Sequence, residues 1–394
     1  MRDAYIIQAV RTPVGKAYKG ALRHTRPDEL GAIAIREAVA RVSGLDVARV
    51  DDVIMGCAMP EAEQGLNVAR IASLRAGMPV TASAMTVNRF CASGLQAIHF
   101  ASARIMLGEA QVVVAGGLES MSMIPMSGNR VSLHLELAVE YPEVYISMGN
   151  TAERVAEKYN VTRADQDRFA LASHQKAARA LAEGRFRDEI VPVTVTEKSI
   201  NAKNKIEART LTFDTDEGVR ADTSLEALAG LKPAFKVDGT VTAGNASQMS
   251  DGAAALVVVS EDVLGDLGIK PLGKLVAYAT AGVEPDLMGI GPVFAVPKAL
   301  RMAGLSMDDI ALVELNEAFA SQAAYVQREL GIPDERLNVS GGAIALGHPL
   351  GCTGAKLATT LLHEMQRRRV EYGVVTMCVG GGMGAAGVFQ RIDA

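Results

Sequence analysis

The stretches VNRFCASGLQAI, residues 87–98, and AQVVVAGGLESM, residues 110–121, carry the clearest signal of the fold. The first part runs from a β-branched segment through a turn into a helical pattern, and the second supplies another β-branched segment. Apolar residues recur at three- and four-residue spacing along the helical part: Leu95, Ile98, Ala101 and Ile105. This spacing predicts a helix over residues 92–107, ended by Gly108. A strand, a turn, a helix and a strand in this order are typical of a βαβ unit around a buried sheet.

The same plan recurs in the C-terminal half of the chain. NVSGGAIALGHPLGCTGA, residues 338–355, and YGVVTMCVGGGMGAAG, residues 372–387, repeat the order of turn, helix and strand. Strand-like runs fall into two series: residues 5–9, 52–55, 84–87, 111–115 and 254–259, then residues 274–278, 310–314, 337–340, 373–377 and 387–391. In this repeat the glycine turn after residue 378 corresponds to Gly116 and Gly117. The sequence therefore predicts an α/β protein built from two similar halves.

A polar segment, residues 118–252, separates the fourth and fifth strands of the first half. It carries several lysines, among them Lys198, Lys203, Lys205, Lys232 and Lys236. Charge alone favours a solvated surface subdomain, because most runs of charge face solvent. A lid over a charged ligand is the alternative.

The composition excludes several classes of protein. Of 394 residues, 49% are hydrophobic and 22% are charged, which suffices to bury a large core and excludes global disorder. A net charge of −5 argues against a nucleic-acid binder. Four cysteines are too few for a disulfide scaffold and indicate reduced thiols. Because the sequence contains no secretory h-region and no apolar window of bilayer length, we expect a cytoplasmic protein without a membrane span.

Cys91 is the first candidate for chemistry. It lies at the predicted helix start, where the helix dipole and unpaired N–H groups favour a thiolate. The small residues that follow it, Ala92, Ser93 and Gly94, leave room for a substrate carbonyl. Free cysteines are also common in protein cores, so position alone leaves a nucleophile and a structural cysteine equally open.

Two further side chains stand at glycine-rich turns. His348 lies between Gly347 and Pro349, where a neutral imidazole exposed to a cleft accepts a proton from a thiol. Cys378 ends a predicted strand and is followed by glycines, a position at which α/β sheets bind ligands. Two cysteines and a histidine at such junctions indicate acyl transfer. They do not indicate a metal site, because the sequence has no CxxC pair and no zinc-type spacing.

Two other motifs are weaker. Asn316 and Glu317 follow the predicted strand 310–314, where they either order a turn or position a water or donor in an oxyanion hole. Residues 382–387 match GxGxxG, but neither the helix nor the acidic residue that a dinucleotide site needs comes after them. We therefore predict no NAD binding.

Taken together, these motifs resemble the thiolase family, the acetyl-CoA C-acyltransferases. The resemblance rests on VNRFCASGLQA, NEAFA, GGAIALGHPLGCTGA and CVGGGMGAAGVF, with RTPVGK at residues 11–16 and VTAGNASQMSDGAAA at residues 241–255. It covers essentially the whole chain. It implies the thiolase fold, in which two βαβαβαββ halves pack as α-β-α-β-α layers with an inserted loop domain. The implied units are an N-terminal half of residues 1–117 plus 250–270, a CoA-binding loop domain of residues 118–249, and a C-terminal half of residues 271–394.

The resemblance also implies a role for each motif residue. Cys91 resembles the nucleophile that takes the acyl group, and His348 resembles the base that activates it and a donor to the thioester oxygen. Cys378 resembles the acid/base that handles the α-proton of acetyl-CoA. Asn316 would hold a water in one oxyanion hole, and the N–H groups of Cys91 and Gly380 would form the other.

The same resemblance implies that the protein binds CoA as a substrate and not as a permanently bound cofactor. Ser247 and Arg220 match family positions that contact the pantetheine and the adenine nucleotide. The apolar tunnel lining is matched by Met148, Ala318 and Phe319. The implied partners are CoA thioesters, further copies of the chain in a homodimer or homotetramer, and a β-oxidation multienzyme. No metal and no nucleic acid are implied.

Three features depart from the short-chain biosynthetic type and favour a degradative 3-ketoacyl-CoA thiolase. Ser147-Met148-Gly149 stands where that type reads His-Met-Gly, NRFCASG replaces an NQLCGSG-like motif, and residues 126–145 look short. The implied reaction is cleavage of 3-ketoacyl-CoA by CoA in fatty-acid β-oxidation; an acetoacetyl-CoA thiolase that condenses two acetyl-CoA is the alternative. Cys378 argues against a ketoacyl-synthase-like enzyme. The full set of two cysteines and a histidine argues against a non-enzymatic CoA- or lipid-binding protein.

Overall fold

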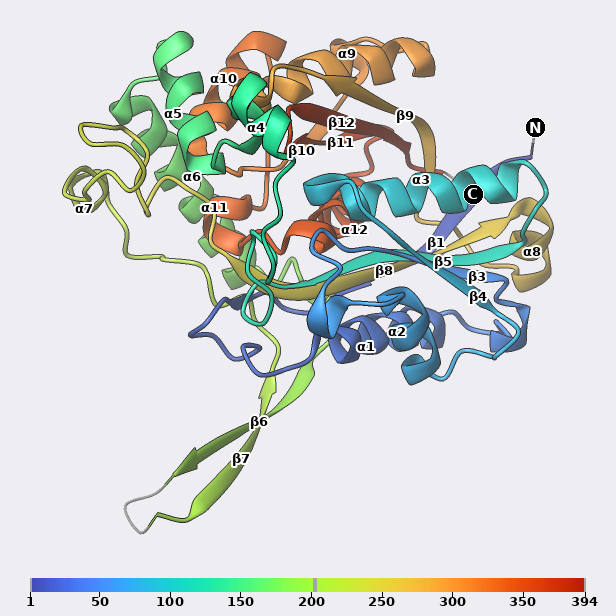
Figure 1. The fold of residues 1–394 in the computed structure, drawn as a ribbon. Helices are drawn as coiled ribbons and strands as arrows, with labels where there is room; N and C mark the ends of the chain where they lie inside the picture. The colour runs from blue at the N-terminus through green and yellow to red at the C-terminus, as the bar shows by residue number, and fades with distance from the viewer. Residues whose placement is uncertain (1, 201–203, 393–394) are drawn as a thin grey trace.

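The first sheet carries the N-terminal half of the fold (Figure 1). The computed structural model describes residues 2–200 and 204–392, but not the side chains of residues 197–200. The strand order is β1-β8-β5-β3-β4, with β2 beside β8, and β3 runs parallel to both of its neighbours. The strands are β1 (Ala4–Arg11), β2 (Gly15–Lys16), β3 (Asp52–Gly56), β4 (Ser83–Val87), β5 (Val112–Ser120) and β8 (Ser250–Ser260). The five strands predicted for this half are confirmed.

The second sheet has the order β10-β11-β12-β9, one strand fewer than predicted. Its strands are β9 (Lys274–Gly282), β10 (Leu312–Leu315), β11 (Tyr372–Val379) and β12 (Met383–Gln390). The strand predicted over residues 337–340 is wrong, since Leu337 forms only an isolated bridge with Val313. Asn338 explains the difference. Its backbone has a φ of 42°, and its side chain bonds the N–H and C=O of Leu315 at 2.8 and 2.9 Å, in place of strand pairing.

Helices cover both sheets and also fill the space between them (Figure 1). Helices α1 (Pro27–Ala40) and α2 (Val68–Ala76) pack on the outer face of the first sheet. Helices α3 (Ser93–Met106) and α12 (Leu350–Arg368) lie between the sheets, and α9 (Gly291–Ala303) and α10 (Ala320–Leu330) cover the outer face of the second. The predicted helix over residues 92–107 and the α-β-α-β-α layering are confirmed.

The two central helices touch through glycine. A Cβ on Gly94 of α3 would lie 2.6 Å from the backbone N of Ala355, and a Cβ on Gly354 of α12 would lie 2.3 Å from that of Leu95. Real side chains do not approach backbone so closely, so this crossing requires glycine on both helices. The crossing brings the N-terminal ends of α3 and α12 side by side, and Cys91 and His348 precede those two ends.

The repeat between the halves fails at one point. Gly116 and Gly117 lie inside β5 and not in a turn like the one that follows Cys378. A Cβ on Gly117 would lie 2.2 Å from the carbonyl O of Gly351, so close packing of α12 explains this glycine.

The polar insert forms a lobe of helices and one projecting hairpin (Figure 1). Its elements are α4 (Leu135–Glu140), α5 (Met148–Lys158), α6 (Arg163–Ala182), β6 (Val193–Ile200), β7 (Ile206–Phe213) and α7 (Leu225–Ala229), and α8 (Glu261–Leu267) follows β8. Of the insert's lysines, Lys203 and the side chain of Lys198 lie outside the described residues. Lys205 is exposed just before β7, and Lys236 pairs with Glu157 at 3.1 Å. Within the described part of the chain, no helix has both the length and the apolar character needed to cross a membrane.

Candidate active site

A tight turn places Cys91 directly after the edge strand β4. Residues Phe90–Ala92 form a single 3₁₀ turn, with φ of Phe90 at 42°. The Ser93 hydroxyl donates to the carbonyl of Phe90 at 2.6 Å and accepts the N–H of Arg89 at 2.8 Å. Asn88 accepts the N–H of Phe90 at 2.8 Å. These contacts fix the strained turn that presents the thiol at the start of α3.

The environment of Cys91 keeps its thiol protonated. Burial raises the pKa of Cys91 to about 12, although hydrogen bonds from the N–H groups of Gly380 and of Cys91 itself act the other way. The N–H groups at the helix start do favour the thiolate, as expected from the sequence, but burial outweighs them in the free protein. A nucleophilic Cys91 would need a base close by.

His348 follows the short helix α11 (Ala343–Leu346) and a glycine with a φ of 90°, Gly347. Its backbone N–H lies 3.1 Å from both the Ser250 hydroxyl and the Gln248 carbonyl O. Burial, together with the charge of Lys356, lowers the pKa of His348 to about 3. The ring is therefore neutral at ordinary pH, with one ring nitrogen left as a hydrogen-bond acceptor.

Each nitrogen of the His348 ring has one side-chain neighbour. Nε2 lies 3.2 Å from Nδ2 of Asn316, and Nδ1 lies 2.6 Å from Oγ1 of Thr353. Asn316 follows β10 and is fixed by a 2.9 Å bond from its N–H to the carbonyl of Thr376. Its Oδ1 is buried and has no hydrogen-bond partner among the described residues. A buried acceptor without a partner is rare, and it marks a place where a water or substrate group can donate.

Cys378 lies near the end of β11, fully buried, and burial with the charge of Cys91 raises its pKa well above the usual value. Cys91, His348 and Cys378 line one cavity of about 450 Å³. The five residues expected to contact CoA also line it: Met148, Arg220, Ser247, Ala318 and Phe319. The remaining walls are mostly apolar, from side chains such as Met121, Met126, Phe235, Met288 and Leu350.

Arg220 carries the only full charge at neutral pH among the described residues that line this cavity. Its N–H donates to Nδ1 of His174 at 3.1 Å. Burial, with the charges of Arg220 and Lys16, lowers the pKa of His174 to about 4, so that ring is neutral as well. His174 was not singled out from the sequence.

Glu119 is a second residue that the sequence reasoning missed. Its buried carboxylate accepts hydrogen bonds from the N–H of Ala58 at 2.8 Å, the N–H of Gly351 at 2.7 Å and the side chain of Gln64 at 2.6 Å. Asn88 in turn donates to the carbonyl of Ala58 at 3.1 Å. Glu119 thus ties the turn that precedes Cys91 to the first turn of α12. The signal in the sequence was a lone carboxylate in an otherwise apolar strand, AGGLES.

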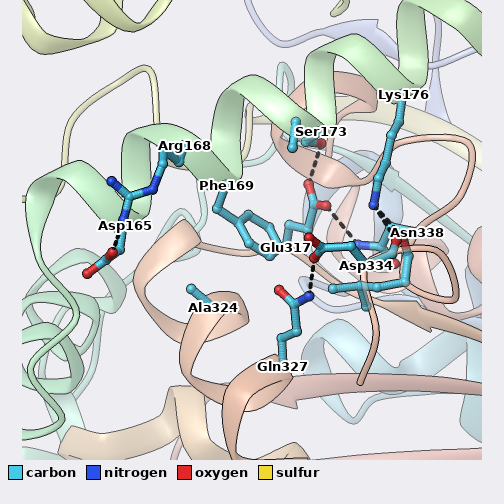
Figure 2. Close-up of a pocket in the computed structure, with 12 residues that line it drawn as sticks. Asp165, Arg168, Phe169, Ser173, Lys176, Glu317, Ala324, Gln327, Asp334 and Asn338 are labelled. Atoms are coloured by element: carbon cyan, nitrogen blue, oxygen red, sulfur yellow. Dashed lines mark hydrogen bonds and ion pairs between the residues drawn. The ribbon is translucent and has the colours of Figure 1, made fainter. Parts of the chain in front are cut away.

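Glu317 lies on the other side of the Asn316 turn, in a separate polar cavity of about 280 Å³ (Figure 2). Its carboxylate accepts from the Ser173 hydroxyl at 2.6 Å, from Asn338 Nδ2 at 2.7 Å and from the N–H of Ile344 at 3.2 Å. The two interpretations of the Asn316-Glu317 pair therefore apply to different residues. Glu317 orders the turn and joins it to α6 and α11, whereas Asn316 faces His348.

Within residues 2–200 and 204–392, no group of three or more His, Cys, Asp or Glu side chains is arranged to hold a metal ion. The four cysteines are free thiols.

Comparison with known proteins places these motifs in a family. Residues 4–262 match the family model described as "Thiolase, N-terminal domain", and residues 269–391 match "Thiolase, C-terminal domain". The 3-ketoacyl-CoA thiolase of Bacillus subtilis is 57% identical over 390 residues, which cover 99% of this chain and 100% of that protein. An acetyl-CoA acetyltransferase of Pseudomonas aeruginosa is 48% identical, with 99% of this chain and 100% of the relative covered. The crystal structure of the Bacillus anthracis acetyl-CoA acetyltransferase superposes with a TM-score of 0.90 at 42% identity, covering 100% of this chain and 99% of that one.

Proposed function

The chain belongs to the thiolase family of acyltransferases, and on that premise we propose that it cleaves 3-ketoacyl-CoA with CoA in fatty-acid β-oxidation. The products are acetyl-CoA and an acyl-CoA shortened by two carbons. The observation that carries the proposal is the 450 Å³ cavity, which joins Cys91, His348 and Cys378 to a largely apolar wall.

Acyl transfer to Cys91 opens the proposed reaction. Neutral His348 takes the proton of the Cys91 thiol, and the thiolate forms a bond to C3 of the substrate. The C2–C3 bond then breaks, and its electron pair passes to C2 as the enolate of acetyl-CoA. Cys378, whose raised pKa keeps it protonated, gives its proton to C2. Free CoA then gives its thiol proton to the Cys378 thiolate and attacks the Cys91 thioester. The shortened acyl group passes to the CoA sulfur, and Cys91 leaves as a thiolate that regains its proton from His348.

Two sets of donors support the oxyanions in this scheme. The N–H groups of Cys91 and Gly380 both reach the Cys91 sulfur, so they converge where a thioester oxygen would lie. The second set is His348 with a water held by Asn316, whose buried Oδ1 lacks a partner within the described chain. Removing a single donor of this kind typically costs about 10²–10³-fold in kcat.

CoA is bound as a substrate in this proposal, and no cofactor is held permanently. Arg220 contacts the nucleotide and Ser247 the pantetheine, while Met148, Ala318 and Phe319 line the path of the arm. Residues 118–249 form the CoA-binding lobe, between an N-terminal half of residues 1–117 plus 250–270 and a C-terminal half of residues 271–394. This assignment replaces the reading of the insert as a merely solvated subdomain.

We also propose that the chain works in the cytoplasm as a homodimer or homotetramer. The outer edge of β4 has no partner strand in the described part of the chain, and Val80 and Met85 are exposed beside it, which supports self-association. The four free thiols agree with a reducing compartment. Association with a β-oxidation multienzyme stays a prediction from the family.

Chain length separates the main proposal from its alternative. An acetoacetyl-CoA thiolase that condenses two acetyl-CoA has the same catalytic groups, and two of the compared proteins carry the name acetyl-CoA acetyltransferase. Each methylene that the apolar wall buries stabilises the complex by up to about 0.8 kcal/mol, or about fourfold in kcat/KM.

Initial rates of thiolysis, measured from C4 to C16 3-ketoacyl-CoA, provide the test. We expect kcat/KM to rise beyond C4, and to fall when the same chain ends in a carboxylate, since the apolar wall offers that carboxylate no partner and Arg220 is assigned to the CoA nucleotide. A strict preference for C4 would favour the condensing alternative.

A further inference from the structure

We propose that Thr353 sets the position of the proton on the His348 ring, with hydrogen on Nδ1 and a free lone pair on Nε2. Thr353 is a positioning residue in this proposal, because it acts through His348. Its effect on catalysis rests on the function proposed above, whereas its effect on the ring does not.

The proton count on the threonine side favours hydrogen on Nδ1. Thr353 Oγ1 lies 3.0 Å from the carbonyl O of Pro349, four residues earlier, and 2.6 Å from His348 Nδ1. A carbonyl oxygen can only accept, so the single hydroxyl proton of Thr353 points to Pro349. The lone pair of Oγ1 then faces Nδ1, which must supply a hydrogen.

The opposite side of the ring leads to the same result independently. Nε2 lies 3.2 Å from the side-chain N of Asn316, which is a donor. A hydrogen on Nε2 would place two donors face to face. A neutral imidazole carries one ring hydrogen, so both neighbours select the same tautomer.

Burial makes this selection strong. Thr353 is 0% exposed and His348 is 4% exposed, so water cannot replace the hydroxyl as partner of Nδ1. The ring is also held independently of Thr353, since the His348 N–H bonds Ser250 and the carbonyl of Gln248. Removing the hydroxyl leaves Nδ1–H without an acceptor, while Asn316 still opposes hydrogen on Nε2. The ring should therefore stay in place, and the two tautomers should become closer in energy, so that part of the population gains the Nε2–H form.

The consequence for catalysis follows from where Nε2 lies. Only the tautomer with hydrogen on Nδ1 offers Nε2 as the base on the Asn316 side of the ring. After Nε2 takes the Cys91 proton, the bond from Nδ1–H to Thr353 persists, so the ring keeps one orientation for returning that proton. In serine proteases the wrong tautomer costs about 10⁴ in kcat, with a carboxylate as the orienting group. A neutral hydroxyl is a weaker orienting group, and we expect a smaller loss of about 10–10².

The test compares Thr353→Val, which keeps the shape and removes the hydroxyl, with Thr353→Ser, which keeps the hydroxyl. Thr359→Val is the matched control, because Thr359 is buried in the same helix and makes the same bond, 2.9 Å to the carbonyl of Ala355, away from His348. The chain has six histidines, so ¹⁵N-histidine labelling gives a simple spectrum. His348→Asn identifies the His348 signal.

We expect the ¹⁵N shifts of His348 to report hydrogen on Nδ1 in the wild type, Thr353→Ser and Thr359→Val, and a gain of the Nε2–H form in Thr353→Val. In kinetics, Thr353→Val should lower kcat by about 10–10²-fold with little change in KM, and Thr353→Ser should restore it. Hydrogen on Nε2 in the wild type, or an unchanged tautomer in a folded Thr353→Val, would overturn the proposal. Absence of thiolase activity in the wild type would refute the proposed function and leave the ¹⁵N result decisive for Thr353.

Discussion

The backbone segments that lead into Cys91 and His348, called here the first and the second route, are built differently. Both residues nevertheless precede helices that cross in the centre of the molecule. In the first half, the regular edge strand β4 ends at Val87 and a single 3₁₀ turn delivers Cys91. In the second half, residues 337–340 give up strand pairing, and a longer loop with α11 leads to His348. The first route is held by backbone pairing and the second by side chains.

On the second route, hydrogen bonds made by the side chains of Asn338 and Glu317 replace the backbone pairing of a strand. Asn338 bonds both backbone groups of Leu315, and Glu317 joins Asn338, Ser173 and Ile344. A sheet edge supplies hydrogen bonds at a fixed spacing, whereas side chains allow the backbone to turn away. The two halves therefore differ most where a glycine-rich loop leads to His348.

The largest expected effects are the losses of activity on replacing Cys91 and His348, the residues at the ends of the two routes. Cys91→Ser should lower kcat/KM by about 10⁴-fold or more and abolish the acyl-enzyme burst, because the thiolate is lost. His348→Ala should cost about 10²–10⁴-fold, the usual range for a general base. The double variant should be no slower than the worse single variant, since residues that act together are not additive. Rapid-quench kinetics measures the rates and the burst, and intact mass detects the acyl-enzyme.

An unchanged burst in Cys91→Ser would refute the nucleophile assignment. If the loss in the double variant equals the product of the two single losses, Cys91 and His348 act independently. That result would contradict the claim that the two routes build one catalytic unit.

Sequence could predict the parts of this arrangement that local pattern controls. The helix after Cys91 follows from apolar spacing, and the layering follows from repeated strand and helix units. The strand predicted at residues 337–340 failed because the alternation of apolar and polar residues there does not show that the Asn338 side chain competes with backbone pairing. Glu119 and Thr353 were missed for a different reason. Glu119 bonds Gly351, 232 positions away, and Thr353 matters only because its hydroxyl meets the His348 ring.

The pKa of Cys91 shows the same limit. A helix terminus can be recognised in sequence, but burial cannot, and burial decides the direction of the shift. Residue types and order thus predicted which groups gather, and tertiary packing decided their protonation.

The crossing of α3 and α12 gives the next largest effect. Gly354→Ala should destabilise the protein by about 3 kcal/mol, because its Cβ would lie 2.3 Å from the backbone N of Leu95 and the helices would have to separate. Gly265→Ala, in α8, is the matched control, since a Cβ there meets nothing within 4 Å. It should stabilise the protein by up to about 1 kcal/mol through helix propensity. Urea unfolding measures both.

Equal and favourable effects of the two substitutions would mean that the helix contact is loose, and that the two routes are not held together at this crossing.

The last comparison tests the two routes directly, through one asparagine on each, and includes the smallest expected effect. Asn338→Ala should cost about 3 kcal/mol, because it leaves buried groups of Leu315 and Glu317 unpaired and places a Cβ residue without a polar side chain at positive φ. Asn67 contacts the first route in a similar way, with its side chain bonded to the carbonyl of Ala84 at 2.8 Å and the hydroxyl of Thr86 at 2.8 Å. Because Asn67 is exposed, water can replace it, and Asn67→Ala should cost only about 1 kcal/mol.

Asn338→Gly separates the two causes at residue 338, since glycine loses the side-chain bonds but accepts the positive φ. If Asn338→Gly recovers most of the loss seen for Asn338→Ala in urea unfolding, backbone strain and not the side-chain bonds explains Asn338. If it recovers less than about 1 kcal/mol, the bonds carry the effect. A cost of Asn67→Ala equal to that of Asn338→Ala would contradict the contrast, because it would mean that β4 depends on side-chain bonds as much as the His348 route does. The expected inequality follows from burial: both asparagines bond the segment that leads to a site residue, but only Asn338 does so where water cannot take its place.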